Sequence, residues 1–495
     1  LHWGPMGTKL AVALAPTSLV DDSYTSRKVR IIDVKSRRII QRINNVGKLG
    51  QIVWSPDGTR LGIIGSVNEK DPQAGRIQVA KANQSRLEDV LPDRGTPVTA
   101  DTVVSGRWNG DYLGHVRKID WFDRENIIYL GDEGVKTVIG KVSINGDTSI
   151  LSIDPEKFIL RDFSISKDRK AIASICSSST HPREVCYWNS KNGQIVRLTN
   201  SNPWLDRIAL GSQEVLQYQA RDGLELEGLL IRPVGYQQGK RYPLIIVAHG
   251  GPESHYRNEW LTAYDRPGQM AATLGYAVFY PNYRGSTGRG VKFSQLGQGD
   301  PAGKEFDDLV DGVDFLIKIG LADPDKVGIT GKSYGGYAAA WGATYYSHKF
   351  AAAVTSFGIA NNISKVGTTD IPEEEYLVHA LRRPWSDWQF FLERSPIYHA
   401  GKSKTPTLIL HGELDPRLPA SQSLELYTHL KKRSQAAVRL IIYPNEKHGN
   451  IRAASRLDYS LRMMRWFDYY LQGSGESIPD FEIEYGLESD RAEKK

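Results

Sequence analysis

The sequence predicts two domains of different class: an all-β, propeller-like domain over residues 1–211, and an α/β domain with a doubly wound, mostly parallel sheet over residues 212–472. The chain has 495 residues, whereas single hydrophobic cores stop growing at about 250–300 residues. Short β-rich segments broken by turns fill the first region. In the second, apolar strands alternate with helical stretches, which is the pattern of a parallel sheet covered on both faces.

The composition is that of an ordinary globular protein, with 40% hydrophobic and 24% charged residues. Lys and Arg number 63 against 57 Asp and Glu, and no block of like charge occurs, so we expect no nucleic-acid partner. No apolar run approaches the about 18 residues of a membrane span. We therefore expect a soluble protein, in the cytoplasm rather than secreted or periplasmic. Because the chain begins at Leu1 in what reads as a strand-turn repeat, we also expect that upstream sequence was removed.

The first region contains a weak internal repeat, in which residues 3–10 match residues 54–61. The aromatic anchors of the repeat are Trp3, Trp54, Trp121 and Phe163, at spacings of 51, 67 and 42 residues. Four-stranded propeller blades give such spacings when some loops are long. The repeat predicts about four blades, the first incomplete. The alternative is a β-sandwich with accidental similarity.

The second region opens with a hairpin of strands 214–219 and 224–232 joined through Asp222-Gly223. Apolar strands alternating with helices follow it. Residues 473–495 form a polar tail that we expect to lie on the surface or to be partly disordered. The predicted strands are 243–248, 277–280, 327–330, 351–356, 407–411 and 438–443, and the clearest helices are 305–319, 421–432 and 457–471.

The strongest motif is Gly331-Lys332-Ser333-Tyr334-Gly335, between an apolar strand and a helix of small residues. A G-x-S-x-G sequence in this context predicts a tight turn that presents a nucleophilic serine, because only glycines leave room around the strained backbone. Ser333 is therefore the predicted nucleophile.

A serine needs an adjacent base, and in this arrangement the chain order is serine, acid, histidine. Only His429 and His448 follow the acid region, and His429 lies within an amphipathic helix. His448, in a loop after strand 438–443, is the predicted base. Glu413 and Asp415 both follow strand 407–411, and spacing does not choose between them.

Acyl transfer also needs backbone donors for the oxyanion. The amide of Tyr334 follows the nucleophile, and His249-Gly250-Gly251-Pro252 follows an earlier strand and offers the Gly251 amide; a plain glycine turn is the alternative. Phe357 and Ile359, after the next strand, are predicted walls of the substrate pocket.

Two pairs of residues carry weaker expectations. Cys176 and Cys186 flank a hairpin tip, so a cross-strand disulfide is conceivable, but two buried free thiols are the favoured interpretation. Two cysteines match no zinc spacing, and no metal site is predicted. Trp385 and Trp388 are expected in the core or in a pocket wall.

Together these residues resemble the prolyl oligopeptidase family of serine peptidases, in particular its acylaminoacyl-peptidase-like branch, an α/β-hydrolase with an N-terminal β-propeller. The resemblance implies that Asp415 is the triad acid and that Gly251 and Tyr334 form the oxyanion hole. Relatives carry about seven blades, whereas this chain has room for about four. The motifs that carry the resemblance are residues 249–252, 282–286, 331–337, 393–396, 411–419 and 448–449.

The predicted activity is that of a serine hydrolase that cleaves peptide or acyl-amino-acid bonds of short substrates through Ser333, Asp415 and His448, with no metal or organic cofactor. One alternative is a carboxylesterase acting on small acyl esters, and a second is a non-catalytic propeller binding protein. The glutamate pair that binds a free N-terminus in dipeptidyl relatives cannot be placed in this sequence, and Glu373-Glu374-Glu375, within the second domain, is expected to be a solvated loop. A short propeller leaves blade edges exposed, from which we expect self-association.

Overall fold

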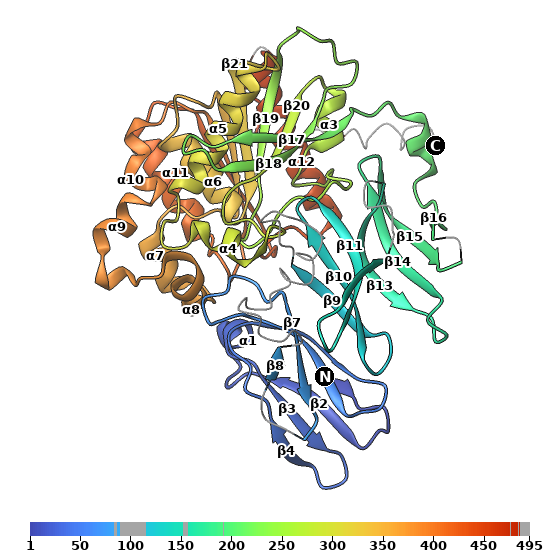
Figure 1. Ribbon diagram of the computed structural model, residues 1–495. Coiled ribbons are helices and arrows are strands. Elements are labelled where there is room, and N and C mark those ends of the chain that lie inside the picture. The colour runs from blue at the N-terminus through green and yellow to red at the C-terminus, as the bar shows by residue number, and fades with distance from the viewer. Residues whose placement is uncertain are drawn as a thin grey trace, which may run out of the picture.

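The computed structural model describes residues 1–83, 87–89, 115–151, 157–191, 193–475, 477–483 and 485. Four small sheets follow one another in an arc, and one large sheet flanked by helices lies beside them (Figure 1). The predicted fold class, an all-β propeller-like part and an α/β part, is confirmed.

Each small sheet has four strands in sequence order, all antiparallel, which is the arrangement of a propeller blade. The strands of the first two sheets are β1 (His2–Trp3), β2 (Lys9–Leu14), β3 (Lys28–Asp33), β4 (Arg38–Arg42), β5 (Leu49–Trp54), β6 (Arg60–Gly65), β7 (Arg76–Lys81) and β8 (Leu87–Asp89). Those of the last two are β9 (Val116–Trp121), β10 (Asn126–Glu133), β11 (Lys136–Ser143), β12 (Thr148–Leu151), β13 (Ile159–Ile165), β14 (Ala171–Ser178), β15 (His181–Asn189) and β16 (Ile195–Arg197).

The sequence repeat corresponds to a repeated turn between the first and second strands of a blade. Ser55 Oγ donates to Asp57 Oδ1 at 2.7 Å, and Ser166 Oγ donates to Asp168 Oδ1 at the same distance. In both turns the serine oxygen also accepts the amide that begins the next strand. Neighbouring sheets share apolar cores, and Trp121 Nε1 on β9 donates to the Val53 carbonyl on β5 at 3.3 Å. The second and fourth small sheets therefore share this turn in their hydrogen bonding as well as in their sequence.

The two cysteines are paired. A disulfide joins Cys176 on β14 to Cys186 on β15, with the Cα atoms 5.9 Å apart. The favoured interpretation of two free thiols was wrong. The ladder places Cys176 opposite Glu184 and Cys186 opposite Ser174, so the cysteines are diagonal neighbours, a relation that requires the strand register and that sequence symmetry about the hairpin did not supply.

The large sheet has eight strands in the order β17-β18-β20-β19-β21-β22-β23-β24. β17 and β18 form the predicted antiparallel hairpin, and all pairs from β20 to β24 are parallel. The strands are β17 (Gln213–Gln219), β18 (Glu225–Ile231), β19 (Tyr242–Ala248), β20 (Ala277–Asn282), β21 (Ala322–Lys332), β22 (Ala352–Ser356), β23 (Thr407–Gly412) and β24 (Val438–Tyr443).

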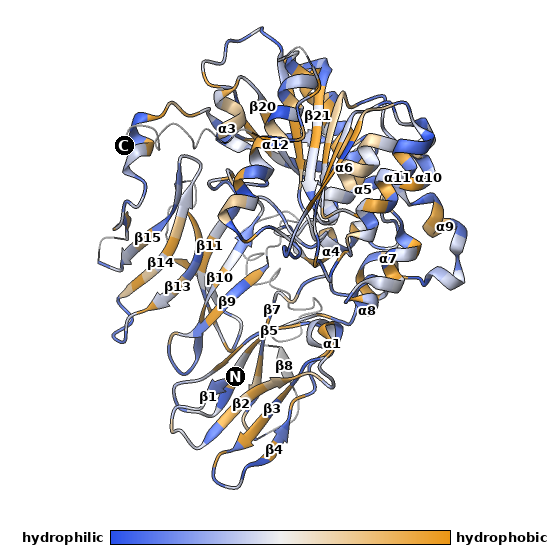
Figure 2. Ribbon diagram, turned by 180° about the vertical axis from the view of Figure 1, so that it is seen from behind, coloured by the Kyte–Doolittle hydropathy of each residue, from blue (hydrophilic) through white to orange (hydrophobic). Residues whose placement is uncertain are grey.

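Helices cover both faces of this sheet, as near-continuous apolar strands require. α3 and α12 pack on one face, and α5, α6 and α11 pack on the other; Figure 2 shows the hydrophobic residues gathered on the central strands and the helix surfaces turned toward them. The α-helices are α1 (Val20–Thr25), α3 (Gly268–Thr273), α4 (Gly290–Ser294), α5 (Lys304–Lys318), α6 (Tyr334–Thr344), α7 (Asn362–Thr368), α8 (Pro372–Glu374), α9 (Trp388–Glu393), α10 (Pro396–His399), α11 (Ser421–Arg433) and α12 (Ala453–Gln472). Shorter turns are the 3₁₀ segments Pro203–Arg207, Gln295–Gly297, Pro384–Ser386 and Ala400–Lys402 and the π-helix Glu375–Ala380.

Two further expectations concern the surface. Trp385 and Trp388 are 65% and 53% exposed, so the expectation that they lie in the core was wrong. Both belong to the short segments around α9 at the edge of the α/β part, and their role as a pocket wall stays a prediction. Of the predicted tail 473–495, residues 476, 484 and 486–495 lie outside the described residues. In the described part, Arg439 on β24 lies over the Phe481 ring at 4.0 Å.

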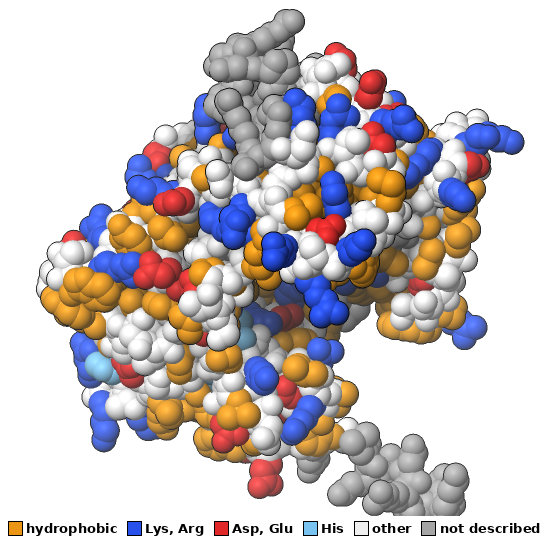
Figure 3. Space-filling model, turned by 90° about the horizontal axis from the view of Figure 1, so that it is seen from below, with side chains coloured by type: hydrophobic (Ala, Val, Ile, Leu, Met, Phe, Trp, Pro, Cys, Tyr) orange, Lys and Arg blue, Asp and Glu red, His pale blue; other side chains and the backbone are white. Residues whose placement is uncertain are grey.

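Charges on the face seen from below in Figure 3 are mixed in sign, and no continuous basic surface covers it. Within the described ranges, no helix combines the length and the apolar character that crossing a membrane requires.

Candidate active site

Ser333 occupies a sharp turn between β21 and α6. Its backbone has φ 62° and ψ −122°, a left-handed conformation that a side chain rarely adopts. The two motif glycines are required by packing: a Cβ on Gly331 would lie 2.4 Å from the Gly335 carbonyl oxygen, and one on Gly335 would lie 2.1 Å from the Ala248 oxygen. The turn stands above the carboxyl end of β21, at the N-terminus of α6, as the motif predicts.

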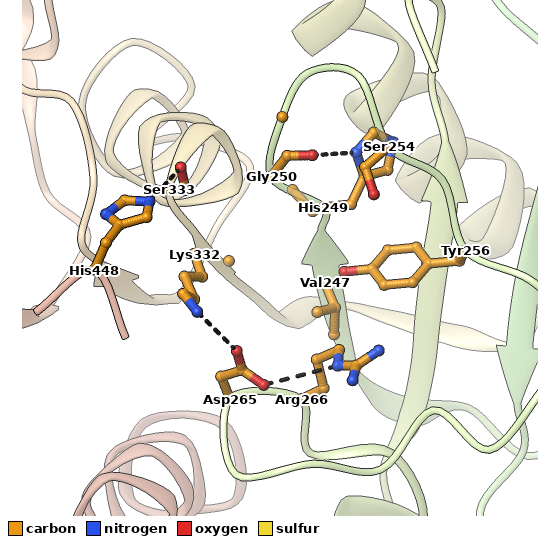
Figure 4. Close-up of a pocket in the computed structure, with 13 residues that line it drawn as sticks. Val247, His249, Gly250, Ser254, Tyr256, Asp265, Arg266, Lys332, Ser333 and His448 are labelled. Atoms are coloured by element: carbon orange, nitrogen blue, oxygen red, sulfur yellow. Dashed lines mark hydrogen bonds and ion pairs between the residues drawn. The ribbon is translucent and has the colours of Figure 1, made fainter. Parts of the chain in front are cut away.

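Three predicted residues from separate loops meet here. Ser333 Oγ lies 2.9 Å from His448 Nε2, and His448 Nδ1 lies 2.7 Å from Asp415 Oδ2. Figure 4 shows the serine and the imidazole facing each other at one end of a cavity. The histidine follows β24 and the aspartate follows β23, so the parallel sheet brings these strand ends to one edge.

Asp415 is buried and held by several donors. The amides of Arg417 and Leu418 donate to its Oδ1 at 2.9 and 3.1 Å. Burial alone would raise the pKa of Asp415, but hydrogen bonds from His411 and His448 outweigh it and lower the pKa to about 2. The carboxylate is thus ionised over the physiological range, and it orients the His448 ring with Nε2 toward the serine.

The remaining predicted alternatives lie elsewhere. Glu413 accepts the Asn445 amide at 3.0 Å and supports the turn after β24. His429 lies on α11 and contacts Arg433 at 3.0 Å. Among the described residues, neither Glu413 nor His429 bonds to His448 or Ser333, so Asp415, not Glu413, is the carboxylate beside the imidazole.

Sequence reasoning missed two residues that support the site. His411 is fully buried, with Nε2 3.3 Å from Asp415 Oδ2 and 2.7 Å from the Leu418 carbonyl. Glu446, 1% exposed, accepts the amides of Ile451 and Arg452 and so closes the loop that carries the histidine. A histidine at the end of a buried strand was the available signal for the first. An acidic residue in a polar loop gave none for the second.

The loop after β19 lies against the nucleophile. A Cβ on Gly250 would lie 2.8 Å from the Lys332 oxygen and 3.2 Å from Ser333 Cβ, and Gly251 has φ +125°. The His249 side chain turns away from the solvent, stacked on Tyr283 at 4.2 Å with Nε2 2.8 Å from Ser286 Oγ. The Tyr334 amide is at the first position of α6, where a backbone N–H has no acceptor within the helix.

A cavity of about 370 Å³ opens at Ser333. Phe357 and Ile359 are buried and do not line it; the Phe357 ring packs edge-on against His448 at 6.0 Å, and Ile359 belongs to the core around α6. As walls of a substrate pocket they stay a prediction. The cavity is lined by Val247, Ala248, His249, Gly250, Gly251, Ser254, Tyr256, Asp265, Arg266, Gly331, Lys332, Ser333 and His448.

The expected solvated loop Glu373-Glu374-Glu375 was wrong for two of its residues. Glu374 and Glu375 are 4% and 8% exposed. They belong to α8 and the π-helix that follows, and they pair with Lys48, the residue before β5, and with Lys365, respectively. The sequence alone does not indicate the pair with Lys48, because Lys48 lies more than 300 residues from Glu374.

His379 lies between Glu375 and Glu253, a residue of the loop that follows β19. Its Nε2 lies 2.8 Å from Glu253 and its Nδ1 lies 3.0 Å from Glu375. Burial alone would lower the pKa of His379, but Glu375 and Glu253 raise it to about 10. Ligand atoms of Glu253, Glu374 and His379 lie within 4.8 Å of one another. A protonated imidazole has no lone pair for a metal ion, so the group is better described as an ion cluster.

Residues 263–474 match the prolyl oligopeptidase family. The chain belongs to this family. This chain is 32% identical over 408 residues to the uncharacterized peptidase YuxL of Bacillus subtilis, and the match covers 79% of this chain and 60% of that protein. It is 27% identical over 484 residues to dipeptidyl-peptidase 5 of Porphyromonas gingivalis, covering 95% of this chain and 66% of that protein.

This member of the prolyl oligopeptidase family thus spans less than two thirds of either relative's length. Its fold is similar to that of an acylaminoacyl peptidase solved in complex with Z-Gly-Gly-Phe-chloromethyl ketone, with a TM-score of 0.76 at 20% identity over 98% of this chain and 71% of that one. That likeness supports an α/β-hydrolase fold with an N-terminal β domain.

Proposed function

We propose that this protein is a serine peptidase that cleaves peptide or acyl-amino-acid bonds of short substrates, with Ser333 as nucleophile, His448 as base and Asp415 as acid. The observation that carries the proposal is the unbroken hydrogen-bonded chain from Ser333 Oγ to His448 to Asp415, at 2.9 and 2.7 Å. Membership of a family of peptidases is consistent with it.

The reaction proceeds by acyl transfer. His448 Nε2 takes the proton of Ser333 Oγ as the oxygen attacks the substrate carbonyl, and the resulting imidazolium is stabilised by Asp415. The imidazolium then gives the proton to the leaving nitrogen, and the acyl group stays on the serine. A water molecule, deprotonated by the same imidazole, releases the acid and restores the enzyme.

The negative oxygen of each tetrahedral intermediate is bound by the amides of Gly251 and Tyr334. Support comes from the glycine loop, which lies against Ser333 and lines its cavity, and from the start of α6, whose dipole favours negative charge. One such donor contributes about 2.7–4 kcal/mol in comparable sites. No step calls for a metal ion or an organic cofactor.

Small acyl esters would react by the same steps. Parallel assays with an acyl-amino-acid anilide and a p-nitrophenyl ester separate the two substrate classes, with Ser333→Ala as the control. We expect anilide hydrolysis that the substitution abolishes. Hydrolysis of the ester alone would contradict the peptidase proposal and favour the esterase.

We also propose that residues 1–211 form the propeller-like module, residues 212–472 the catalytic module and residues 473–495 a surface tail. Self-association through an outer blade is part of the proposal. Its support is the last small sheet, on which Ile175, Val185 and Val196 are 37%, 37% and 49% exposed, because an uncovered apolar sheet face favours pairing with another surface.

A further inference from the structure

The cavity at Ser333 contains three charged side chains that the proposed mechanism does not use. Lys332 Nζ lies 3.9 Å from Asp265 Oδ2, and Arg266 Nε lies 3.7 Å from Asp265 Oδ1. Figure 4 shows the Lys332 ammonium and Nε of Arg266 facing this one carboxylate, with the two terminal nitrogens of Arg266 directed away from it. Both separations exceed hydrogen-bond length, and within the described part of the chain neither cationic side chain donates a hydrogen bond. Two cations therefore share a single anion, and their N–H groups are available to a ligand.

The Lys332 ammonium lies on the side of the cavity that carries the imidazole. A Cβ on Gly449, the residue after His448, would lie 2.6 Å from its Nζ. The ammonium is 5.8 Å from the Phe357 ring centre, and that ring is 6.0 Å from the His448 ring. The leaving nitrogen receives its proton from His448, so the leaving group occupies this same side.

Resting on the proposed function, we propose that Lys332 and Arg266 form a subsite for the free carboxylate of the leaving group. The enzyme then prefers short peptides with an unblocked C-terminus and releases a small C-terminal fragment. The Lys332 ammonium and the His448 imidazole each lie about 6 Å from the Phe357 ring. The distance between the two is therefore limited to roughly the reach of three extended residues, at about 3.3–3.6 Å each. The released fragment is accordingly one to three residues long.

A carboxylate fits this pair for electrostatic reasons. Charge-assisted hydrogen bonds are about twice as strong as neutral ones, and the guanidinium of Arg266 can bind a carboxylate with two parallel bonds. The side chains of Lys332 and Arg266 are 31% and 32% exposed, so the site is partly desolvated and its attraction is screened only in part by salt. Asp265 holds the two cations in place but also repels an incoming anion. Removing that negative charge should therefore strengthen binding.

The test uses peptide pairs that differ only in a C-terminal acid or amide. Binding to the Ser333→Ala protein is measured by calorimetry, so that no turnover is needed. We expect the acid to bind at least about tenfold more tightly than the amide, a ratio equivalent to about 1.4 kcal/mol. In the Ser333→Ala background, Lys332→Met should bring the ratio toward one, whereas Asp265→Asn should raise it.

Lys326→Met is the matched control, since Lys326 lies on the same strand with its side chain 49% exposed and its ion pair is with Asp323. It removes one positive charge outside the cavity and should leave the ratio unchanged. Opposite shifts in Lys332→Met and Asp265→Asn do not arise from general loss of structure. Equal binding of acid and amide, or an equal loss of the preference in Lys326→Met, would overturn the carboxylate subsite.

Hydrolysis by the protein with Ser333 intact separates this inference from the proposed function. Mass spectrometry of the products should show C-terminal fragments of one to three residues. Hydrolysis of peptides with acid and amide treated equally would refute the subsite and leave the peptidase function standing. Selective binding of the acid with no hydrolysis would support the subsite and contradict the peptidase function.

Discussion

Asp132 links the propeller-like part to the α/β part and offers a quantitative test of how the two are held together. It lies on β10 and is 1% exposed. Arg257 of the α/β part binds both of its carboxylate oxygens at 2.7 Å, and Arg117 approaches to 3.0 Å. Burial alone would raise the pKa of Asp132, but Arg257 and Arg117 hold it well below its usual value. Replacing it by asparagine keeps the shape and removes the charge.

Asp132→Asn leaves two arginines buried without their counter-ion, because their side chains are only 12% and 17% exposed. Removing one partner of a buried ion pair costs about 3–5 kcal/mol. The matched control is Asp162→Asn, which removes the charge of an aspartate whose side chain is 58% exposed and which pairs with Lys118. Exposed pairs contribute about 0–1 kcal/mol.

Equilibrium urea unfolding followed by circular dichroism measures both variants at pH 7. We expect a loss several times larger for Asp132→Asn than for Asp162→Asn. Because the pKa of Asp132 is lowered in the folded protein, its contribution is present above about pH 4 and is lost as the pH falls below the unfolded value. The wild-type protein should therefore approach the Asp132→Asn variant in stability on acidification. Equal losses in the two variants at pH 7 would refute the reasoning.

Three further predictions concern the site and Glu305, a buried residue whose carboxylate accepts a hydrogen bond from the Tyr334 hydroxyl. Asp415→Asn should lower kcat by about 10⁴, as the equivalent change does in serine proteases, in a protein that circular dichroism shows to be folded; a loss below tenfold would contradict the role of Asp415 in orienting His448. Gly250→Ala, whose new methyl would lie 3.2 Å from Ser333 Cβ, should displace the oxyanion loop and reduce kcat/KM by about 10²-fold or more; wild-type activity would count against that loop. Burial, partly offset by a hydrogen bond from Tyr334, raises the pKa of Glu305 to about 8. The protonated carboxyl therefore stabilises the protein most below about pH 4.3. This contribution to the free energy of unfolding is lost as the pH rises to 8, at about 1.4 kcal/mol per pH unit. Glu305→Gln should remove this slope in urea unfolding, and an unchanged slope would exclude Glu305 as its source.

The sequence predicted the α/β sheet almost strand for strand, because its strands are apolar throughout and each is bounded by turns. The sharp turn at Ser333 was predictable for a related reason: the glycines around this residue leave a local signature of a strained backbone. His448 and the loop with Asp415 followed from chain order, although the choice of Asp415 over Glu413 depended on family resemblance.

Residues whose partners are distant in the chain were predicted poorly. Glu374 and Glu375 looked like a solvated acidic run because Lys48 and Lys365, which neutralise them, are not adjacent in sequence. The pairing of Cys176 depended on strand register. Trp385 is exposed despite its size, since side-chain type favours burial without determining which surface covers the residue.

Site mapping of a fluorophosphonate adduct tests the central claim most directly. The intact protein is incubated with the probe, digested and analysed by mass spectrometry, with Ser333→Ala treated in parallel. The account predicts one adduct per chain, located on Ser333, and none in the Ser333→Ala protein. An unmodified wild-type protein, or an adduct on another serine, would contradict it.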